Sequence, residues 1–255
     1  MNPDLGQYKA FLFDMGNTLL DFHAMGPSDE EKDRIGIQRF AQLVGSRFGM
    51  HIAVEECQVG WFHPWHEYQQ HERKRTLREL DFCRMVERFL QQKNLRPTPE
   101  DLLDLASAFH APHAEHVCVS EGVLPCLVRL KELGMRICVV SNAALPAPLF
   151  IKVFESQGLA PFIDSYHFSH SNQFMKPHPS LFKQALKACG CLPAEAMMIG
   201  DSYEADIRGA KRIGCITCLY GKTEEPSFWP EADFQVASFL EFRSWLTESK
   251  RSVRV

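Results

Sequence analysis

The sequence lacks the long hydrophobic runs, the one-sided charge and the leader-like start that mark several protein classes. No run in its 255 residues approaches about 18 consecutive apolar positions, so we expect no transmembrane helix and no membrane partner. The 28 basic and 32 acidic residues give a formal net charge of −4 without long blocks of one sign, which argues against a nucleic-acid partner. The segment MNPDLGQYKAFLFDM has no basic stretch before a long apolar run, so we expect no signal peptide.

Cysteine is too scattered in this chain to predict a disulfide framework. The nine cysteines are odd in number and irregularly spaced, which is typical of reduced thiols. With 45% hydrophobic and 24% charged residues the composition is that of a globular protein with a real core, and it excludes collagen-like and disordered chains. We therefore expect a cytoplasmic globular protein, either a monomer or a homodimer.

Two kinds of periodicity divide the chain. Residues 28–116 are helical throughout, with start signals at Ser28 and Thr98 and two further helices around 54–74 and 78–93. Outside this insert, short apolar runs alternate with helical segments, which predicts a mostly parallel sheet covered by helices on both faces. The predicted strands are 9–15, 136–141, 165–169, 196–200, 214–220 and 232–237, and the predicted helices between them are 122–133, 179–189 and 203–213.

Polar residues stand where several of these strands end. Asp14 ends the first run, Ser141 and Asn142 end the second, and Asp201 follows the strand at 196–200. Because ligands bind at the carboxyl ends of strands in such a sheet, we expect these side chains to converge at one edge. A lysine in a loop after a weaker strand, Lys176, would join them.

This combination of side chains suits phosphoryl chemistry. Carboxylates such as Asp14, Asp201 and Asp206 can hold Mg²⁺ through oxygen. The Lys176 ammonium and the Ser141 hydroxyl can bind phosphate oxygens, and a carboxylate can attack phosphorus to form an aspartyl-phosphate. Each residue alone could be an ordinary helix cap or strand end, but four strand ends that all carry such groups indicate a site.

The ordered set resembles the haloacid dehalogenase (HAD) superfamily. The run Phe11-Leu-Phe-Asp14-Met-Gly16-Asn17-Thr18 is similar to its first motif, D-x-D-x-T. Val139-Val-Ser141-Asn142, Lys176-Pro-His-Pro179 and Gly200-Asp-Ser-Tyr-Glu-Ala-Asp206 are similar to the second, third and fourth motifs. The resemblance implies an α/β fold with a Rossmann-like core domain at residues 1–20 and 119–255. The helical insert, residues 21–118, would be a helical C1-type cap domain.

The resemblance also implies roles for individual residues. Asp14 would be the nucleophile, and a small phosphorylated molecule would be the substrate. Mg²⁺ would be held by Asp14, Asp201, Asp206 and the backbone carbonyl of Gly16. The transferring phosphoryl group would be bound by Ser141, Asn142, Lys176 and Thr18, with Thr18 supporting the loop of the nucleophile.

Gly16 departs from the pattern, because most phosphatases of this superfamily have a second aspartate at that place. A glycine moves no proton, and a positioned general acid–base is worth roughly 10²–10⁴-fold in rate. The run Gly16-Asn17 has the D-x-G-N form of branches that are similar to sugar phosphatases. The candidates for a replacement proton donor in the cap are His23, Glu30, His63, His66 and His71.

Three functions remain open from the sequence. The first is a phosphatase that acts on substrates with good leaving groups, such as anomeric sugar phosphates. The second is hydrolysis of a carbon–halogen or carbon–phosphorus bond; the phosphonatase type would need a cap lysine, for which the candidates are Lys32, Lys74 and Lys93. The third is a binding protein that kept the fold without turnover. A basic patch around residues 71–78 could hold a second anionic group of a substrate, although a solvated helix face is the simpler interpretation.

Overall fold

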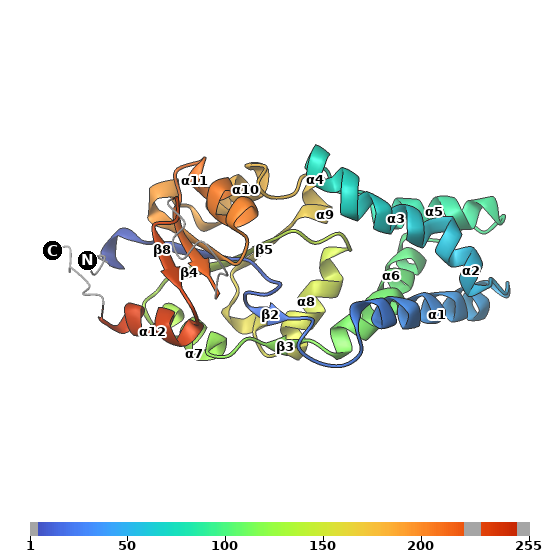
Figure 1. The fold of residues 1–255 in the computed structure, drawn as a ribbon, viewed down its shortest axis with the longest axis horizontal. Coiled ribbons are helices and arrows are strands. Elements are labelled where there is room, and N and C mark those ends of the chain that lie inside the picture. Colours follow the sequence, from blue (N-terminus) through green and yellow to red (C-terminus); the bar gives the residue numbers. More distant parts are fainter. Residues whose placement is uncertain (1–4, 222–230, 249–255) are drawn as a thin grey trace.

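The computed structural model describes residues 5–221 and 231–248, and these form an α/β part and a helical part (Figure 1). The α/β part contains the first strand and the described residues after residue 120, as the alternating pattern predicts. The helical part lies beyond the carboxyl ends of the strands. Within the described ranges, no helix combines the length and the apolar character needed to cross a membrane.

A six-stranded parallel sheet forms the centre of the α/β part, in the order β5-β4-β1-β6-β7-β8. The central strand β1 is buried at every residue, which is why it reads as an unbroken apolar run in the sequence. The predicted parallel α/β sheet is thus confirmed. The strands are β1 (Ala10–Phe13), β4 (Arg136–Ser141), β5 (Ser165–Phe168), β6 (Ala196–Gly200), β7 (Ile216–Tyr220) and β8 (Phe234–Val236).

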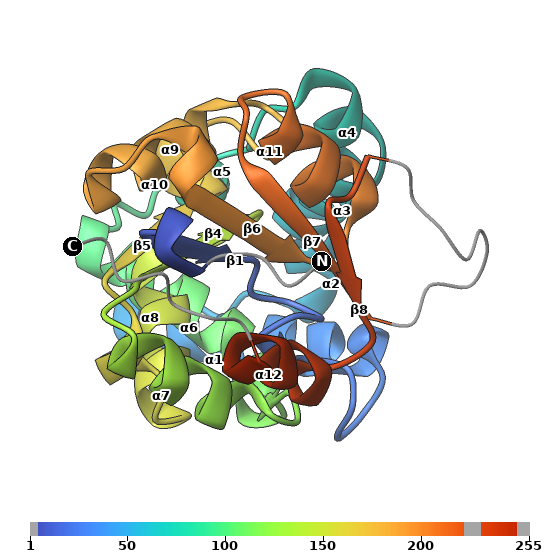
Figure 2. The ribbon, with the colours of Figure 1, turned by 90° about the vertical axis from the view of Figure 1, so that its left-hand side faces the viewer.

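Helices cover both faces of this sheet (Figure 2). Phe11 and Phe13 of β1 pack on one face with α7 (Val123–Glu132), α8 (Ala147–Ser156) and α12 (Phe239–Glu248). Ala10 and Leu12 pack on the other with α10 (Ser180–Cys189) and α11 (Gly209–Lys211). The shorter helical turns are Leu5–Gln7, Ala160–Phe162, α9 (Ser169–Asn172), Pro193–Glu195 and the π-helical turn Tyr203–Arg208. The helix predicted at 203–213 is therefore a π-helical turn that continues into α11.

The helical part, which we call the cap, is built from four long stretches. They are α1 (Asp29–Phe48), a continuous helical rod over residues 54–76, α5 (Phe82–Gln92) and α6 (Pro99–Glu115). The rod comprises α2 (Val54–Cys57), π-helical Gln58–Phe62, α3 (His63–Glu67), π-helical Tyr68–Glu72 and α4 (Arg73–Thr76). The start signals act as predicted: the Ser28 hydroxyl accepts from the Glu31 amide, and Thr98 and Asp101 cap each other.

An aromatic core holds the cap together. Trp61 of the rod is fully buried, and its ring lies 4.8 Å from that of Phe40, 5.3 Å from Phe82 and 5.1 Å from Phe109 (ring centroids). These three rings come from α1, α5 and α6, so a single side chain joins every element of the cap. Aromatic contacts at such distances add to the stabilisation from burial alone.

Two short strands that the sequence analysis did not predict join the cap to the sheet. β2 (Leu20–Asp21) pairs antiparallel with β3 (Cys118–Val119). The predicted domain junctions, between residues 20 and 21 and between 118 and 119, both fall within this two-stranded ladder. The cap also touches the α/β part at a second place: the Glu79 amide donates to the Gln173 carbonyl over 2.9 Å, and the Met175 amide donates to the Leu77 carbonyl over 3.0 Å. This second contact explains why α5 starts at residue 82 rather than at 78.

Candidate functional site

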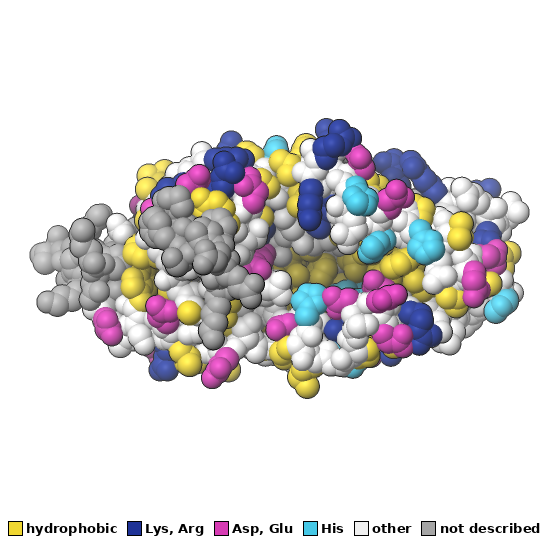
Figure 3. All heavy atoms as spheres, viewed as in Figure 1, with side chains coloured by type: hydrophobic (Ala, Val, Ile, Leu, Met, Phe, Trp, Pro, Cys, Tyr) yellow, Lys and Arg dark blue, Asp and Glu magenta, His cyan; other side chains and the backbone are white. Residues whose placement is uncertain are grey.

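A cavity of about 1000 Å³ lies between the carboxyl edge of the sheet and the cap. Figure 3 shows it as a hollow with apolar side chains at the bottom and with acidic and histidine side chains along its rim. Seven of the eight predicted site residues line this cavity: Asp14, Gly16, Ser141, Asn142, Lys176, Asp201 and Asp206. The eighth, Thr18, is fully buried in the segment between β1 and β2 and is not among the lining residues.

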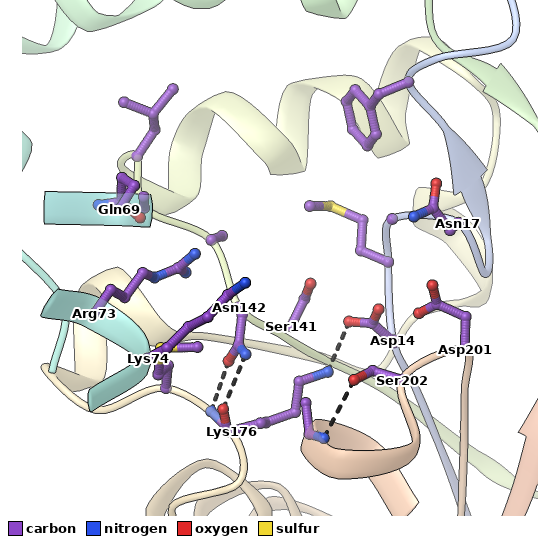
Figure 4. A pocket seen from close by; sticks show the side chains of 18 of the residues that line it. Asp14, Asn17, Gln69, Arg73, Lys74, Ser141, Asn142, Lys176, Asp201 and Ser202 are labelled. Atoms are coloured by element: carbon purple, nitrogen blue, oxygen red, sulfur yellow. Dashed lines mark hydrogen bonds and ion pairs between the residues drawn. The ribbon is translucent and has the colours of Figure 1, made fainter. Parts of the chain in front are cut away.

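The ammonium of Lys176 is the centre of the site. It donates to Asp14 Oδ1 over 2.7 Å (Figure 4), to Asp206 Oδ1 over 2.6 Å and to the carbonyl of Val140 over 2.7 Å. All three donor positions of the ammonium are thereby used. The side chain is almost completely buried, so these bonds fix its position beside Asp14.

Burial and charge act on this cluster in opposite directions. Burial alone would lower the pKa of Lys176, but Asp14 and Asp206 together raise it above its ordinary value. Burial raises the pKa of Asp206 to about 7, and the charge of Asp14 adds to this effect while Lys176 opposes it. The pKa of Asp201 is raised by burial and by Asp14. The positive charge of Lys176 therefore does not fully balance the negative charges of Asp14, Asp201 and Asp206, and the pKa values of Asp201 and Asp206 stay raised.

The three carboxylates suit a divalent cation. Ligand oxygens of Asp14, Asp201 and Asp206 all lie within 4.8 Å of one another. Hard cations such as Mg²⁺ prefer several oxygen ligands of this kind, and an added positive charge would relieve the repulsion that raises the carboxyl pKa values. The residues present therefore fit the metal that the sequence analysis expects.

Gly200 allows the acidic loop to close over the end of β6. A Cβ at this position would meet Asp206 Oδ2 at 2.2 Å, so a larger residue would displace the carboxylate. The same oxygen accepts from the Ser202 amide over 3.1 Å. The glycine before Asp201 is thus explained by the close approach of Asp206 rather than by an unusual φ angle.

Asn142 connects the end of β4, which carries Ser141, to the loop that carries Lys176. Its side-chain oxygen accepts from the Lys176 amide over 2.6 Å, and its side-chain nitrogen donates to the Lys176 carbonyl over 3.1 Å. Both ends of the amide are therefore used for positioning the lysine. Ser141, at the end of β4, is buried next to this connection.

Open space surrounds Gly16. A Cβ built on this residue meets no heavy atom within 4 Å, and its φ angle is not left-handed. The next residue, Asn17, does have a positive φ of 53°. Neither sterics nor backbone conformation therefore requires glycine at position 16, and the lack of an acid there is a chemical feature of the site.

The cap supplies the opposite wall, on which sequence reasoning was least informative. Gln69, Arg73 and Lys74 of the rod face the side of the cavity opposite Asp14 (Figure 4). Arg73 is tied to Glu79 by contacts of 2.6 and 2.8 Å. Arg73 and Lys74 belong to the basic patch, so part of that patch lines the cavity instead of forming only a solvated face.

The structure also separates the candidates that the sequence left open. Of the five proton-donor candidates in the cap, His23 and His66 line the cavity. Of the three candidates for the cap lysine of a phosphonatase, only Lys74 lines the cavity. Lys32 is buried and donates to the Phe22 carbonyl over 2.6 Å, and Lys93 is paired with Glu56 at 2.5 Å.

Comparisons with known proteins find similar chains among phosphatases and dehalogenases. A relative named ribulose-1,5-bisphosphate 5-phosphatase, from Halopiger xanaduensis, is 28% identical over 228 residues, which cover 88% of this chain and 89% of the relative. A glyceraldehyde 3-phosphate phosphatase from Pyrococcus abyssi is 33% identical over 117 residues, and the chain spans about half of its length (48%). The crystal structure of a 2-haloacid dehalogenase from Pseudomonas syringae has a TM-score of 0.62 at 18% identity, covering 94% of this chain and 98% of that one, and so shares the fold.

The family model of the haloacid dehalogenase-like hydrolases matches residues 8–214. This range includes all four motifs and the whole cap. It also ends close to the last residue of the acidic loop that carries Asp201 and Asp206. The chain therefore belongs to the haloacid dehalogenase-like hydrolases.

Proposed function

We propose that this protein is a Mg²⁺-dependent phosphatase that acts on a small phosphorylated metabolite, with a sugar phosphate as the substrate class. The observation that carries the proposal is the cluster of Asp14, Lys176, Asp201 and Asp206 at the floor of the cavity. It combines a carboxylate nucleophile, a fixed ammonium and the ligands for a hard cation.

In the proposed reaction, a carboxylate oxygen of Asp14 attacks phosphorus while the bond from phosphorus to the ester oxygen of the substrate breaks. The electron pair of that bond leaves with the ester oxygen. Lys176 and Ser141 stabilise the negative charge on the phosphoryl oxygens. Water then attacks the aspartyl-phosphate and releases inorganic phosphate and free Asp14. Mg²⁺ held by Asp14, Asp201, Asp206 and the Gly16 carbonyl would supply further neutralisation of charge.

Gly16 restricts which substrates this site hydrolyses well. Without a carboxyl group at position 16, the leaving oxygen has no proton donor from that loop. Esters whose leaving oxygen is a weak base, such as anomeric sugar phosphates, lose least from this absence. His23 and His66 line the cavity and are the cap residues in a position to assist.

A phosphorylated sugar fits the rest of the cavity. The cavity has a volume of about 1000 Å³, which is larger than a phosphate group requires, so the remaining space is available to the organic part of the substrate. The relatives named for ribulose-1,5-bisphosphate and glyceraldehyde 3-phosphate support phosphorylated sugars and trioses as the class. Lys74 on the cap wall would meet a second anionic group of such a molecule.

The test is phosphate release from a panel of esters, with Mg²⁺ and with EDTA. The panel contains anomeric and other sugar phosphates, a sugar bisphosphate, nucleotides and an aryl phosphate. We expect Mg²⁺-dependent release that disappears in Asp14→Asn. The control is Asp104→Asn, which makes the same chemical change at an exposed site outside the cavity.

A second pair of variants tests the role assigned to Gly16. Gly16→Asp has room for its side chain and should raise turnover of poor leaving groups, up to the roughly 10²–10⁴-fold that a general acid–base provides. Gly16→Asn has the same shape but transfers no proton and should give no such gain. If the whole panel stays unhydrolysed while a 2-haloacid loses halide, or phosphonoacetaldehyde is cleaved with Lys74 trapped by borohydride, the phosphatase proposal is wrong.

A further inference from the structure

A second group of metal-ligating side chains lies outside the catalytic cluster, where the cap meets the α/β part. Ligand atoms of Asp81, Cys83 and His170 all lie within 4.8 Å of one another. Asp81 and Cys83 stand at the start of α5 in the cap, whereas His170 belongs to α9, directly after β5. We propose that these three residues bind a zinc ion that fastens the cap to the α/β part.

The geometry around His170 supports an ion. Its Nε2 is buried and has no hydrogen-bond partner within the described part of the chain. It faces Asp81 Oδ1 at 3.8 Å, which is too far for a hydrogen bond. Zinc bonds of about 2.0–2.2 Å to nitrogen and oxygen in a tetrahedron separate the two ligand atoms by about 3.3–3.5 Å. The observed spacing is a few tenths of an ångström wider, so a small movement of the exposed Asp81 side chain would bring both atoms onto one ion.

The chemistry of the three side chains selects zinc over magnesium. A thiolate, an imidazole and a carboxylate are the ligands that Zn²⁺ takes in proteins, whereas Mg²⁺ prefers oxygen alone. Asp81 is mostly exposed, with 57% of its side chain accessible, so water can occupy a fourth position. Asp81 Oδ1 also accepts from the Arg84 amide over 3.1 Å, which orients the carboxylate.

The ion would lie beside existing bonds between the two parts. Glu79 accepts a hydrogen bond from the Ser169 hydroxyl, and its amide donates to Gln173. Within the α/β part, the His170 amide donates to the Ala143 carbonyl over 3.0 Å, in the loop that follows Ser141. A zinc ion at this place would hold the cap closed over the cavity. The site is independent of the proposed phosphatase reaction, since none of its ligands belongs to the catalytic cluster.

The first measurement is zinc binding to the full chain after chelation, with saturating Mg²⁺ present to fill the acidic cluster. We expect one Zn²⁺ per chain, with affinity at least tenfold weaker in Cys83→Ser and in Asp81→Asn. Asparagine retains the helix cap of α5, so Asp81→Asn removes the ligand charge without removing the cap. Cys57→Ser and His51→Gln change the same residue types elsewhere in the cap and should bind as the wild type does.

Cobalt distinguishes this site from the catalytic one. Co²⁺ bound to a thiolate gives a charge-transfer band in the near ultraviolet, and a site built only of carboxylates gives none. The band should persist in Asp14→Asn and vanish in Cys83→Ser. Zn²⁺ should also slow hydrogen exchange of the Glu79 and Met175 amides at least tenfold, because both donate across the junction. Zinc stoichiometry and affinity that are equal in Cys83→Ser, Asp81→Asn and the wild type, or no bound zinc at all, would overturn the proposal.

Discussion

Replacement of Lys176 by methionine tests how the catalytic cluster is stabilised. Methionine keeps the length and most of the volume of the side chain but removes the ammonium. Asp14 and Asp206 then lose hydrogen bonds of 2.7 and 2.6 Å and the positive charge that donates both of them. The perturbation therefore isolates the electrostatic role of the lysine.

The burial of Lys176 and Asp206 determines how much unfolding free energy is lost when the ammonium is removed. Lys176 has 1% of its surface exposed and Asp206 has none, so water replaces little of the lost interaction. Removal of one partner from a buried ion pair costs about 3–5 kcal/mol of unfolding free energy. In the double variant Lys176→Met/Asp206→Asn the second carboxylate becomes a neutral amide of the same shape. We expect the double variant to be more stable than the single one by at least about 1 kcal/mol, within the usual range for contacting residues.

Urea unfolding in EDTA, followed by tryptophan fluorescence, measures both quantities without bound metal. Lys183→Met, an exposed position on α10, is the control and should stay within about 0.5 kcal/mol of the wild type. If Lys176→Met lowers the free energy of unfolding by less than about 1 kcal/mol, the reasoning is refuted, since two buried carboxylates without a compensating charge should destabilise the fold by more than that. A double variant no more stable than the single one would refute it equally.

Three further predictions concern the cap and are measured by unfolding or by kinetics. Gly36→Ala should destabilise the protein by about 1–3 kcal/mol in thermal unfolding, because the new Cβ would meet the Phe109 carbonyl oxygen at 2.2 Å. Gly45→Ala on the same helix is the control: its Cβ meets nothing closer than 3.9 Å, so the substitution should be neutral or stabilising. Burial lowers the pKa of His110 to about 3, so as the pH falls below 6.5 the imidazole is protonated in the unfolded chain before it is protonated in the folded one. Between pH 7 and pH 5, the free energy of unfolding measured in urea should therefore fall by about 2 kcal/mol more in the wild type than in His110→Gln. Lys74→Ala should raise KM for a sugar bisphosphate at least tenfold with little change in kcat, and an unchanged KM would remove Lys74 from substrate binding.

Parallel strands are the part of the fold that the sequence predicts best. β4 and β6 match their predicted ranges at residues 136–141 and 196–200, because a strand buried on both faces needs a continuous apolar run. Two of the longer helices, α8 and α12, lie outside the predicted ranges for different reasons. α8 follows Pro146 and has no polar cap residue to announce it. α12 does have a signal in the sequence, since the Ser238 hydroxyl accepts from the Glu241 amide and the Glu241 carboxylate accepts from the Ala237 amide, much as in a capping box.

The candidate site divides in the same way. The convergence of Asp14, Ser141, Lys176 and Asp201 follows from parallel topology, which brings the carboxyl ends of strands to one edge. The cap wall does not follow from any local pattern. Arg73 lines the cavity because the segment Leu77–Glu79 pairs with Gln173–Met175, and this pairing depends on how the cap and the α/β part meet. The hydrophobic periodicity of a helix predicts which of its faces is buried, but it does not predict which residues the polar face contacts.

The ladder between β2 and β3 has a consequence for protein engineering. Asp21 and Cys118 are direct partners in this antiparallel pair, so the chain leaves for the cap and returns from it at adjacent points. Opposite residues in such a pair have Cα atoms only about 4.5–5.5 Å apart, the spacing that a two-residue β-turn closes. Replacement of residues 22–117 by an Asn-Gly turn would convert the ladder into a hairpin. Because the two crossings are adjacent, we expect that helical inserts of different size can be joined at β2 and β3 without a change in the strand order of the sheet.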